Sequence, residues 1–219
     1  MVGECVAGSE RVSVGRFSNS VLKRPTGICR GSTEFEYFVT EGDEAEGLIR
    51  KVDIDQGNTF LLVERVSNFV SPVSIVFIKE ISKLFVAGHN DIYKIDTTSG
   101  AVSSITSGSI GVRDGELEKS EFKDITSITS LSNELLMVLS IYSIRLVDLK
   151  NKQVSSLELW TQQNLKMHAL LNLPEENSVL VGMENGISKI SLEDLSRISM
   201  IGKINSVNSE LAPDMIGFK

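Results

Sequence analysis

The chain has 219 residues, 41% of them hydrophobic, and its 22 Lys and Arg against 29 Asp and Glu give a formal net charge of −7. This length and apolar content can support one globular domain without a dense disulfide framework or metals. The negative charge disfavours binding to nucleic-acid backbones or anionic membranes, because the basic clusters are short and separated.

The number of cysteines and the lengths of the apolar runs lead to an expectation about the cellular location of the chain. Cys5 and Cys29 are the two cysteines, which favours a cytosolic chain with two thiols and leaves one disulfide possible. The N-terminus lacks the basic segment and apolar run of a secretory signal, and no run of about 18 apolar residues could span a membrane. We therefore expect no signal peptide and no membrane span in this chain, and a cytoplasmic location is favoured.

Short apolar segments, each typical of a β-strand, recur along the chain in a fixed order. The first predicted element is a strand at residues 2–8, and four repeats follow, at approximately 22–64, 72–107, 122–159 and 166–202. Each repeat opens with a strand anchored on an aliphatic residue, namely Ile28, Ile75, Ile128 and Leu170 in turn. The second strands are predicted at 37–40, 84–87, 136–139 and 179–182. The third strands are predicted at 49–53, 92–96, 144–148 and 187–191, and the fourth at 60–63, 102–105, 154–157 and 198–201.

The third strands carry the most regular pattern. They have aliphatic residues at their first and fourth positions, and the first three end in Asp53, Asp96 and Asp148, whereas the last ends in Ser191. Four short strands recurring every 42 to 53 residues, with turn-forming residues between them, are typical of a β-propeller blade. The predicted fold is therefore all-β, a propeller of four-stranded antiparallel blades.

The linker before the third repeat resembles that of NHL repeats. Gly108 to Gly111, then Asp114-Gly115, lead to Phe122, which is similar to the Asp-Gly linker and aromatic anchor of that family. Two other copies keep an opening of the form Pro-x-Gly/Ser-Ile, at 25–28 and 72–75. The family usually has an Asp after the second strand, and this chain departs from that pattern with Glu41, Gly88, Ser140 and Met183.

Partial repeats are predicted at both ends. Residues 2–8 are similar to the outermost strand of a preceding blade, and residues 212–219, anchored on Ile216, are similar to the innermost strand of a following one. Because an open ring exposes strand edges and an apolar face, we expect the chain to be part of a larger propeller, or a small ring with a defective closing blade.

The candidate binding residues lie in the turns between second and third strands, which should share one rim of the propeller. The acidic turn of residues 41–47, which includes Asp43 and Glu44, lacks a calcium-loop pattern, so a solvated loop is the favoured interpretation. His89, Asn90 and Asp91 form the next such turn, and Tyr142 and Asn185 occupy the last two. Aromatic rim residues are frequent anchors for a partner, but the sequence alone favours Tyr142 as a solvated turn residue.

These features predict a non-enzymatic scaffold that binds a protein or peptide through its rim loops. The resemblance also leaves open a lactonase or lyase type of enzyme with a metal at the central channel. His89 and His168 are the two histidines, fewer than a catalytic zinc usually needs, so no catalytic residue, metal or cofactor is predicted. RNA binding, known for some NHL proteins, is disfavoured by the charge.

Overall fold

The computed structural model describes residues 14–42, 46–64, 69–157, 166–193, 195 and 198–203. The strands predicted at 2–8 and 212–219 lie outside these residues. The described chain forms four antiparallel sheets in chain order, which we call blades 1 to 4.

Blades 1 and 2 come from the first half of the chain. Blade 1 has the strand order β1-β5-β4-β3-β2 and comprises β1 (Gly15–Arg16), β2 (Pro25–Arg30), β3 (Glu36–Gly42), β4 (Gly47–Asp53) and β5 (Asn58–Val63). Blade 2 has the order β6-β7-β8-β9 and comprises β6 (Ser74–Ile78), β7 (Lys83–Ala87), β8 (Ile92–Asp96) and β9 (Val102–Ser104). Short 3-10 turns lie at η1 (Phe17–Asn19) and η2 (Lys79–Ile81).

Blades 3 and 4 repeat this construction. Blade 3 has the order β10-β14-β13-β12-β11 and comprises β10 (Gly115–Glu116), β11 (Ile125–Ser130), β12 (Leu135–Ser140), β13 (Ser143–Asp148) and β14 (Gln153–Leu157). Blade 4 has the order β15-β16-β17-β18 and comprises β15 (Met167–Leu173), β16 (Ser178–Met183), β17 (Gly186–Ser191) and β18 (Ile198–Lys203). Two more 3-10 turns lie at η3 (Leu117–Lys119) and η4 (Pro174–Glu176).

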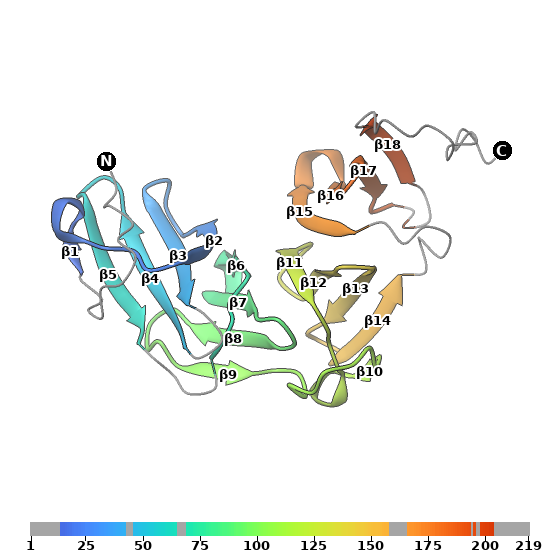
Figure 1. Ribbon diagram of the computed structural model, residues 1–219, viewed down its shortest axis with the longest axis horizontal. Helices are drawn as coiled ribbons and strands as arrows, with labels where there is room; N and C mark the ends of the chain where they lie inside the picture. The colour runs from blue at the N-terminus through green and yellow to red at the C-terminus, as the bar shows by residue number, and fades with distance from the viewer. Residues whose placement is uncertain are drawn as a thin grey trace.

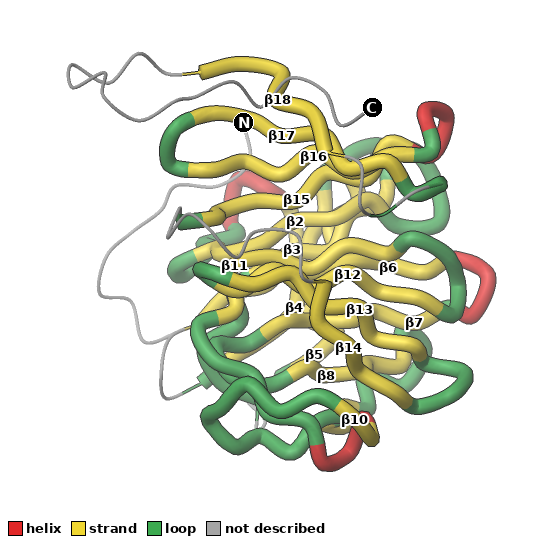
Figure 2. The backbone as a smooth tube through the Cα atoms, turned by 90° about the vertical axis from the view of Figure 1, so that its right-hand side faces the viewer, coloured by secondary structure: helices red, strands yellow, loops and turns green. Residues whose placement is uncertain are grey.

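The blades radiate from their first strands, as Figure 1 shows. β2 packs against β6, β6 against β11, and β11 against β15, so these four strands lie nearest the centre. The side view in Figure 2 shows the strands crossing the arc, with connections gathered along its two rims. This arrangement confirms the predicted all-β propeller of antiparallel blades.

Two blades carry a fifth strand that the repeat pattern did not predict. β1 pairs with the outer edge of β5, and β10 pairs in the same way with β14. Gly15 and Gly115 begin these strands with φ values of 115° and 108°, where a side chain would be strained. The strands were missed because each contains only two residues, too few for an alternating pattern.

Apolar side chains fill the spaces between neighbouring blades. Ile49, Ile92 and Ile144 occupy equivalent places in the third strands and are 0 to 1% exposed. Each lies in a cluster that joins its own blade to the next one along the chain. Burial on both faces of a sheet explains the nearly continuous apolar runs of the second strands.

The acids that end the third strands close turns on the rim opposite the candidate site. Asp53 accepts a hydrogen bond from the Gln56 N–H at 3.0 Å, and Asp148 accepts one from the Asn151 N–H at 2.8 Å. Asp96 likewise accepts from the main chain of Thr98 and Ser99. These carboxylates stabilise turns between third and fourth strands, as Asp commonly does.

Candidate functional site

The candidate site is the rim that carries the turns between second and third strands together with the linkers between blades. In blade 2 the turn is closed by a hydrogen bond of 2.9 Å from the Gly88 N–H to the Asp91 carbonyl. The His89 carbonyl accepts a hydrogen bond of 2.9 Å from the N–H of Ile125, the first residue of β11. The turn of one blade is therefore fixed to the innermost strand of the next, while the His89 side chain is exposed and Asn90 is half-buried.

The Asp91 carboxylate points into the protein rather than toward a ligand. Its Oδ1 accepts hydrogen bonds from Ser104 Oγ at 2.8 Å, from the Ile92 N–H at 2.8 Å and from Thr106 Oγ1. Burial raises the pKa of this carboxyl, and the hydrogen bonds partly offset that effect. Asp91 therefore holds the start of the linker after β9 against the rim, a role that was not predicted from the sequence.

Tyr142 occupies the equivalent turn of blade 3. The adjacent Ile141 accepts a hydrogen bond of 2.9 Å at its carbonyl from the N–H of Met167 in β15, which repeats the tie between His89 and Ile125. The Tyr142 side chain is 58% exposed. A large aromatic side chain is thus presented on a turn whose backbone is fixed by the next blade.

The remaining predicted residues lie in the turns of blades 4 and 1. Asn185 is half-buried, and its Oδ1 atom is buried without a hydrogen-bond partner in the described part of the chain. Asp43 and Glu44 lie outside the described residues. The structure therefore places His89, Asn90, Asp91, Tyr142 and Asn185 in turns of one rim, distributed over three blades.

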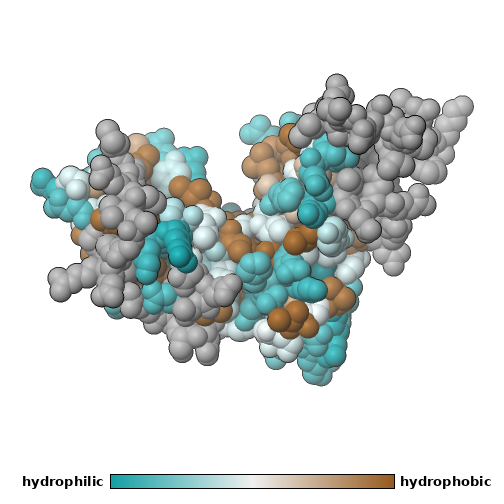
Figure 3. All heavy atoms as spheres, in the orientation of Figure 1, coloured by the Kyte–Doolittle hydropathy of each residue, from teal (hydrophilic) through white to brown (hydrophobic). Residues whose placement is uncertain are grey.

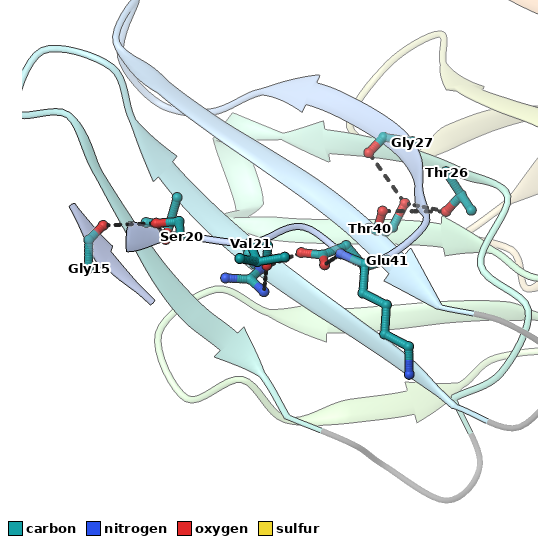
Figure 4. Close-up of polar contacts among 10 residues, drawn as sticks. Gly15, Ser20, Val21, Thr26, Gly27, Thr40 and Glu41 are labelled. Atoms are coloured by element: carbon teal, nitrogen blue, oxygen red, sulfur yellow. Dashed lines mark hydrogen bonds and ion pairs between the residues drawn. The ribbon is translucent and has the colours of Figure 1, made fainter. Parts of the chain in front are cut away.

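Glu41, at the edge of the acidic turn predicted to be solvated, is buried instead. Its carboxylate pairs with Arg50 of β4, and both side chains are 0% exposed. Arg50 also donates from Nη2 to the Val21 carbonyl at 2.7 Å, and the Lys23 N–H donates to Glu41 at 2.6 Å (Figure 4). This ion pair attaches the linker preceding β2 to blade 1.

Arg145 of β13 makes the corresponding attachment in blade 3. Its guanidinium donates to Asp114 Oδ1 at 2.6 and 2.9 Å and to the Glu121 carbonyl at 2.6 Å. Its Cζ atom lies 4.0 Å from the centroid of the Phe122 ring, a cation–π contact. The Asp-Gly linker and aromatic anchor seen in the sequence thus meet at Arg145, whose role the sequence reasoning missed.

The linker of residues 105–114 adds apolar surface to the site. Ile110 is 68% exposed and Val112 is 74% exposed. The linker is held in place on both sides of them, because the Ser107 N–H donates to the Ser120 carbonyl at 3.1 Å and the Arg113 carbonyl accepts a hydrogen bond from the Glu121 N–H at 3.1 Å. These exposed side chains therefore project from a fixed backbone, as Tyr142 does.

No three side chains of His, Cys, Asp and Glu come together as possible metal ligands in the described part of the chain. None of the helices described is long and apolar enough to cross a bilayer.

The sequence matches no protein-family model and no curated protein. The structure is similar to an auxiliary nutrient binding protein from Bacteroides thetaiotaomicron VPI-5482, with a TM-score of 0.69 and 8% identity over 94% of this chain and 49% of that one. A structural genomics protein of unknown function from the same organism has a TM-score of 0.60 and 12% sequence identity, over 91% of this chain and 48% of that one. A chain of a nidogen/laminin complex has a TM-score of 0.60 and 13% sequence identity, over 81% of this chain and 62% of that one.

These neighbours are β-propeller-like. The fold is a β-propeller. The chain spans about half the length of the first two neighbours, which agrees with the expectation of a partial propeller. Identities of 8 to 13% show the fold alone, so the propeller class is supported and the narrower NHL resemblance is not.

Proposed function

We propose that this chain is a binding scaffold of NHL-like construction that recognises a protein or peptide through the rim carrying Tyr142, Ile110 and Val112. The observation that carries the proposal is the 58% exposure of Tyr142 on a turn fixed to the next blade by the hydrogen bond between Ile141 and Met167. A preformed backbone lowers the entropic cost of binding, and exposed aromatic side chains are frequent energetic anchors.

Three further observations support the proposal. Ile110 and Val112 add aliphatic surface on a linker that is also held by main-chain hydrogen bonds. The NHL-like part of the proposal rests on the linker, where Asp114 and Phe122 both contact the buried Arg145. One of the similar structures is a nidogen/laminin complex, so a fold of this kind occurs in a protein assembly.

The test is selection of peptides from a random display library against the full chain. Affinities of the enriched peptides are then measured by fluorescence polarisation for the wild type, for Tyr142→Ala and for the double variant Ile110→Ser/Val112→Ser. We expect Tyr142→Ala to weaken binding about tenfold or more, because truncating an aromatic anchor commonly costs over 1 kcal/mol.

The matched control is Ile54→Ser. Ile54 is 46% exposed and follows β4 on the opposite rim, so this variant should bind the selected peptides as the wild type does. Enriched peptides that bind all variants equally would contradict the proposal, as would peptides sensitive only to Ile54→Ser or a selection that enriches no peptide.

A further inference from the structure

Among the described residues, the exposure of equivalent positions shows which blade face has no neighbouring blade. We call the side of a blade that meets the next blade its following face. In blades 1, 2 and 3 this face carries Ile49, Ile92 and Ile144, which are 0 to 1% exposed because the next blade covers them. Ile187 occupies the same place in β17 of blade 4 and is 44% exposed.

Other residues on the following face of blade 4 share this property. Leu171 of β15 is 57% exposed and lies opposite Leu180 of β16 in the strand pairing. Its equivalent in blade 2, Val76, is partly buried against the core between blades 2 and 3. The following face of blade 4 therefore carries an apolar surface, formed by Leu171, Leu180 and Ile187, that matches the covered following faces of blades 1, 2 and 3. A contiguous apolar surface of this kind usually marks a site of contact with another segment or protein.

The face of each blade that points toward the preceding blade shows the same relationship between exposure and a covering neighbour. Ile75 and Ile128 point toward the preceding blade and are 5% and 4% exposed, whereas Ile28, the equivalent residue of blade 1, is 67% exposed. Figure 3 shows a broad indentation between blades 1 and 4, with hydrophobic surface along its margins. Exposure at these positions thus reports whether a neighbouring blade is in place.

The sequence contains a segment with the pattern needed to cover blade 4. Residues 213–218 repeat the spacing Pro-x-x-Ile-x-Phe of residues 72–77, which include the innermost strand of blade 2. In that strand Ile75 packs against Phe38 and Ile49 on the following face of blade 1. In this sequence comparison Ile216 corresponds to Ile75.

We infer that residues 212–219 form the innermost strand of a fifth blade, seated on the surface of Leu171, Leu180 and Ile187. The occupant is a segment of this chain and not a second copy, because the three covered faces are each filled by the repeat that follows next in the sequence. This inference is independent of the proposed binding function.

The test is cross-linking with a short bismaleimide in a background with Cys5→Ser and Cys29→Ser. Ile187→Cys combined with Ile216→Cys should give an intrachain cross-link, read by peptide mass spectrometry. The matched control pairs Ile216→Cys with Val112→Cys, since Val112 is also exposed but lies on the linker before blade 3. We expect a yield about tenfold or more above this control, because a seated segment raises the effective concentration of the two thiols.

Thermal unfolding of each variant tests whether it is folded, because Cys29→Ser replaces a partly buried thiol that packs against the core, whereas Ile187 and Val112 are exposed. Equal yields for the two pairs would overturn the inference, because residues 212–219 would then have no preferred place. Cross-links found only between chains would also overturn it, since a second copy would then cover blade 4.

Discussion

Arg50 of β4 and Arg145 of β13 occupy the same place in blades 1 and 3, and each donates a hydrogen bond to a main-chain carbonyl of the linker entering its own blade. The acceptors are Val21 at 2.7 Å and Glu121 at 2.6 Å. The anionic partners differ, because Arg50 pairs with Glu41 from within the sheet and Arg145 pairs with Asp114 from the linker. The same attachment is therefore achieved with two different carboxylates.

Arg50→Met should destabilise the protein more than Arg145→Met. Removing Arg50 leaves Glu41 as a fully buried charge, which should cost about 3–5 kcal/mol. Asp114 is 40% exposed and can be solvated after Arg145 is removed, so we expect about 2–3 kcal/mol there, mainly from unsatisfied carbonyls. Urea unfolding at neutral pH measures both.

The control for this comparison is Lys150→Met. Lys150 and Glu134 form an exposed ion pair at 3.4 Å, and its loss should change stability by about 0.5 kcal/mol or less. Adding Glu41→Gln to Arg50→Met should recover part of the loss. Equal costs for Arg50→Met and Arg145→Met would show that burial of the carboxylate does not decide the effect.

We expect the protein to lose stability in acid as the turn carboxylates of Asp96 and Asp148 become protonated. The hydrogen bond from Lys83 is the largest cause that lowers the pKa of Asp96, and the Asn151 N–H is the largest for Asp148. A carboxyl with a lower pKa in the folded state stabilises fully above its unfolded pKa of about 4, and the effect is lost as pH falls through the folded value. The thermal midpoint of Asp96→Asn/Asp148→Asn should therefore fall less than that of the wild type below about pH 4. Parallel declines in both proteins would argue against this assignment.

Asp91 should respond to pH in the opposite direction. Because burial raises its pKa, the folded state binds this proton more readily than the unfolded state does. The penalty of the buried charge is present above the raised pKa and disappears as pH falls to the unfolded value of about 4. As the pH is lowered through this range, the free energy of unfolding of the wild type, measured in urea, should rise relative to that of Asp91→Asn. A stability difference that stays constant with pH would contradict the prediction.

Cys29 should react slowly in the folded protein. Burial raises the pKa of its thiol to about 12, and the reactive thiolate is therefore scarce at neutral pH. In a Cys5→Ser variant, labelling by iodoacetamide at pH 8 should be more than about tenfold slower in buffer than in urea. Mass spectrometry of the labelled peptide follows the reaction, and similar rates in both solvents would mean that the thiol is accessible in the folded protein.

The regular elements were predictable because their pattern is local. Alternating apolar residues and a final acid at Asp96 or Asp148 located the third strands, and the acids proved to close the turns that follow them. The buried polar residues were not predictable in this way. Glu41 was taken as part of a solvated turn, because its partner Arg50 lies across a turn and the contact depends on strand register.

The candidate site was predicted only in part for the same reason. The turn positions of His89 and Tyr142 follow from strand order, which a sequence pattern gives. The inward orientation of Asp91 depends on Ser104 and Thr106 beyond the next strand, and nothing in the local sequence marks these hydroxyls as its partners.

The hydrogen bond between Ile125 and His89 also bears on how the protein unfolds. It joins two adjacent blades, and the contacts among innermost strands likewise connect only neighbours. Stability in such an architecture is close to a sum of nearest-neighbour terms, as in linear repeat arrays. In the described part of the chain blades 1 and 4 each contact one other blade, whereas blades 2 and 3 each contact two. The amides of blades 1 and 4 should consequently lose their protection against hydrogen exchange before those of blades 2 and 3.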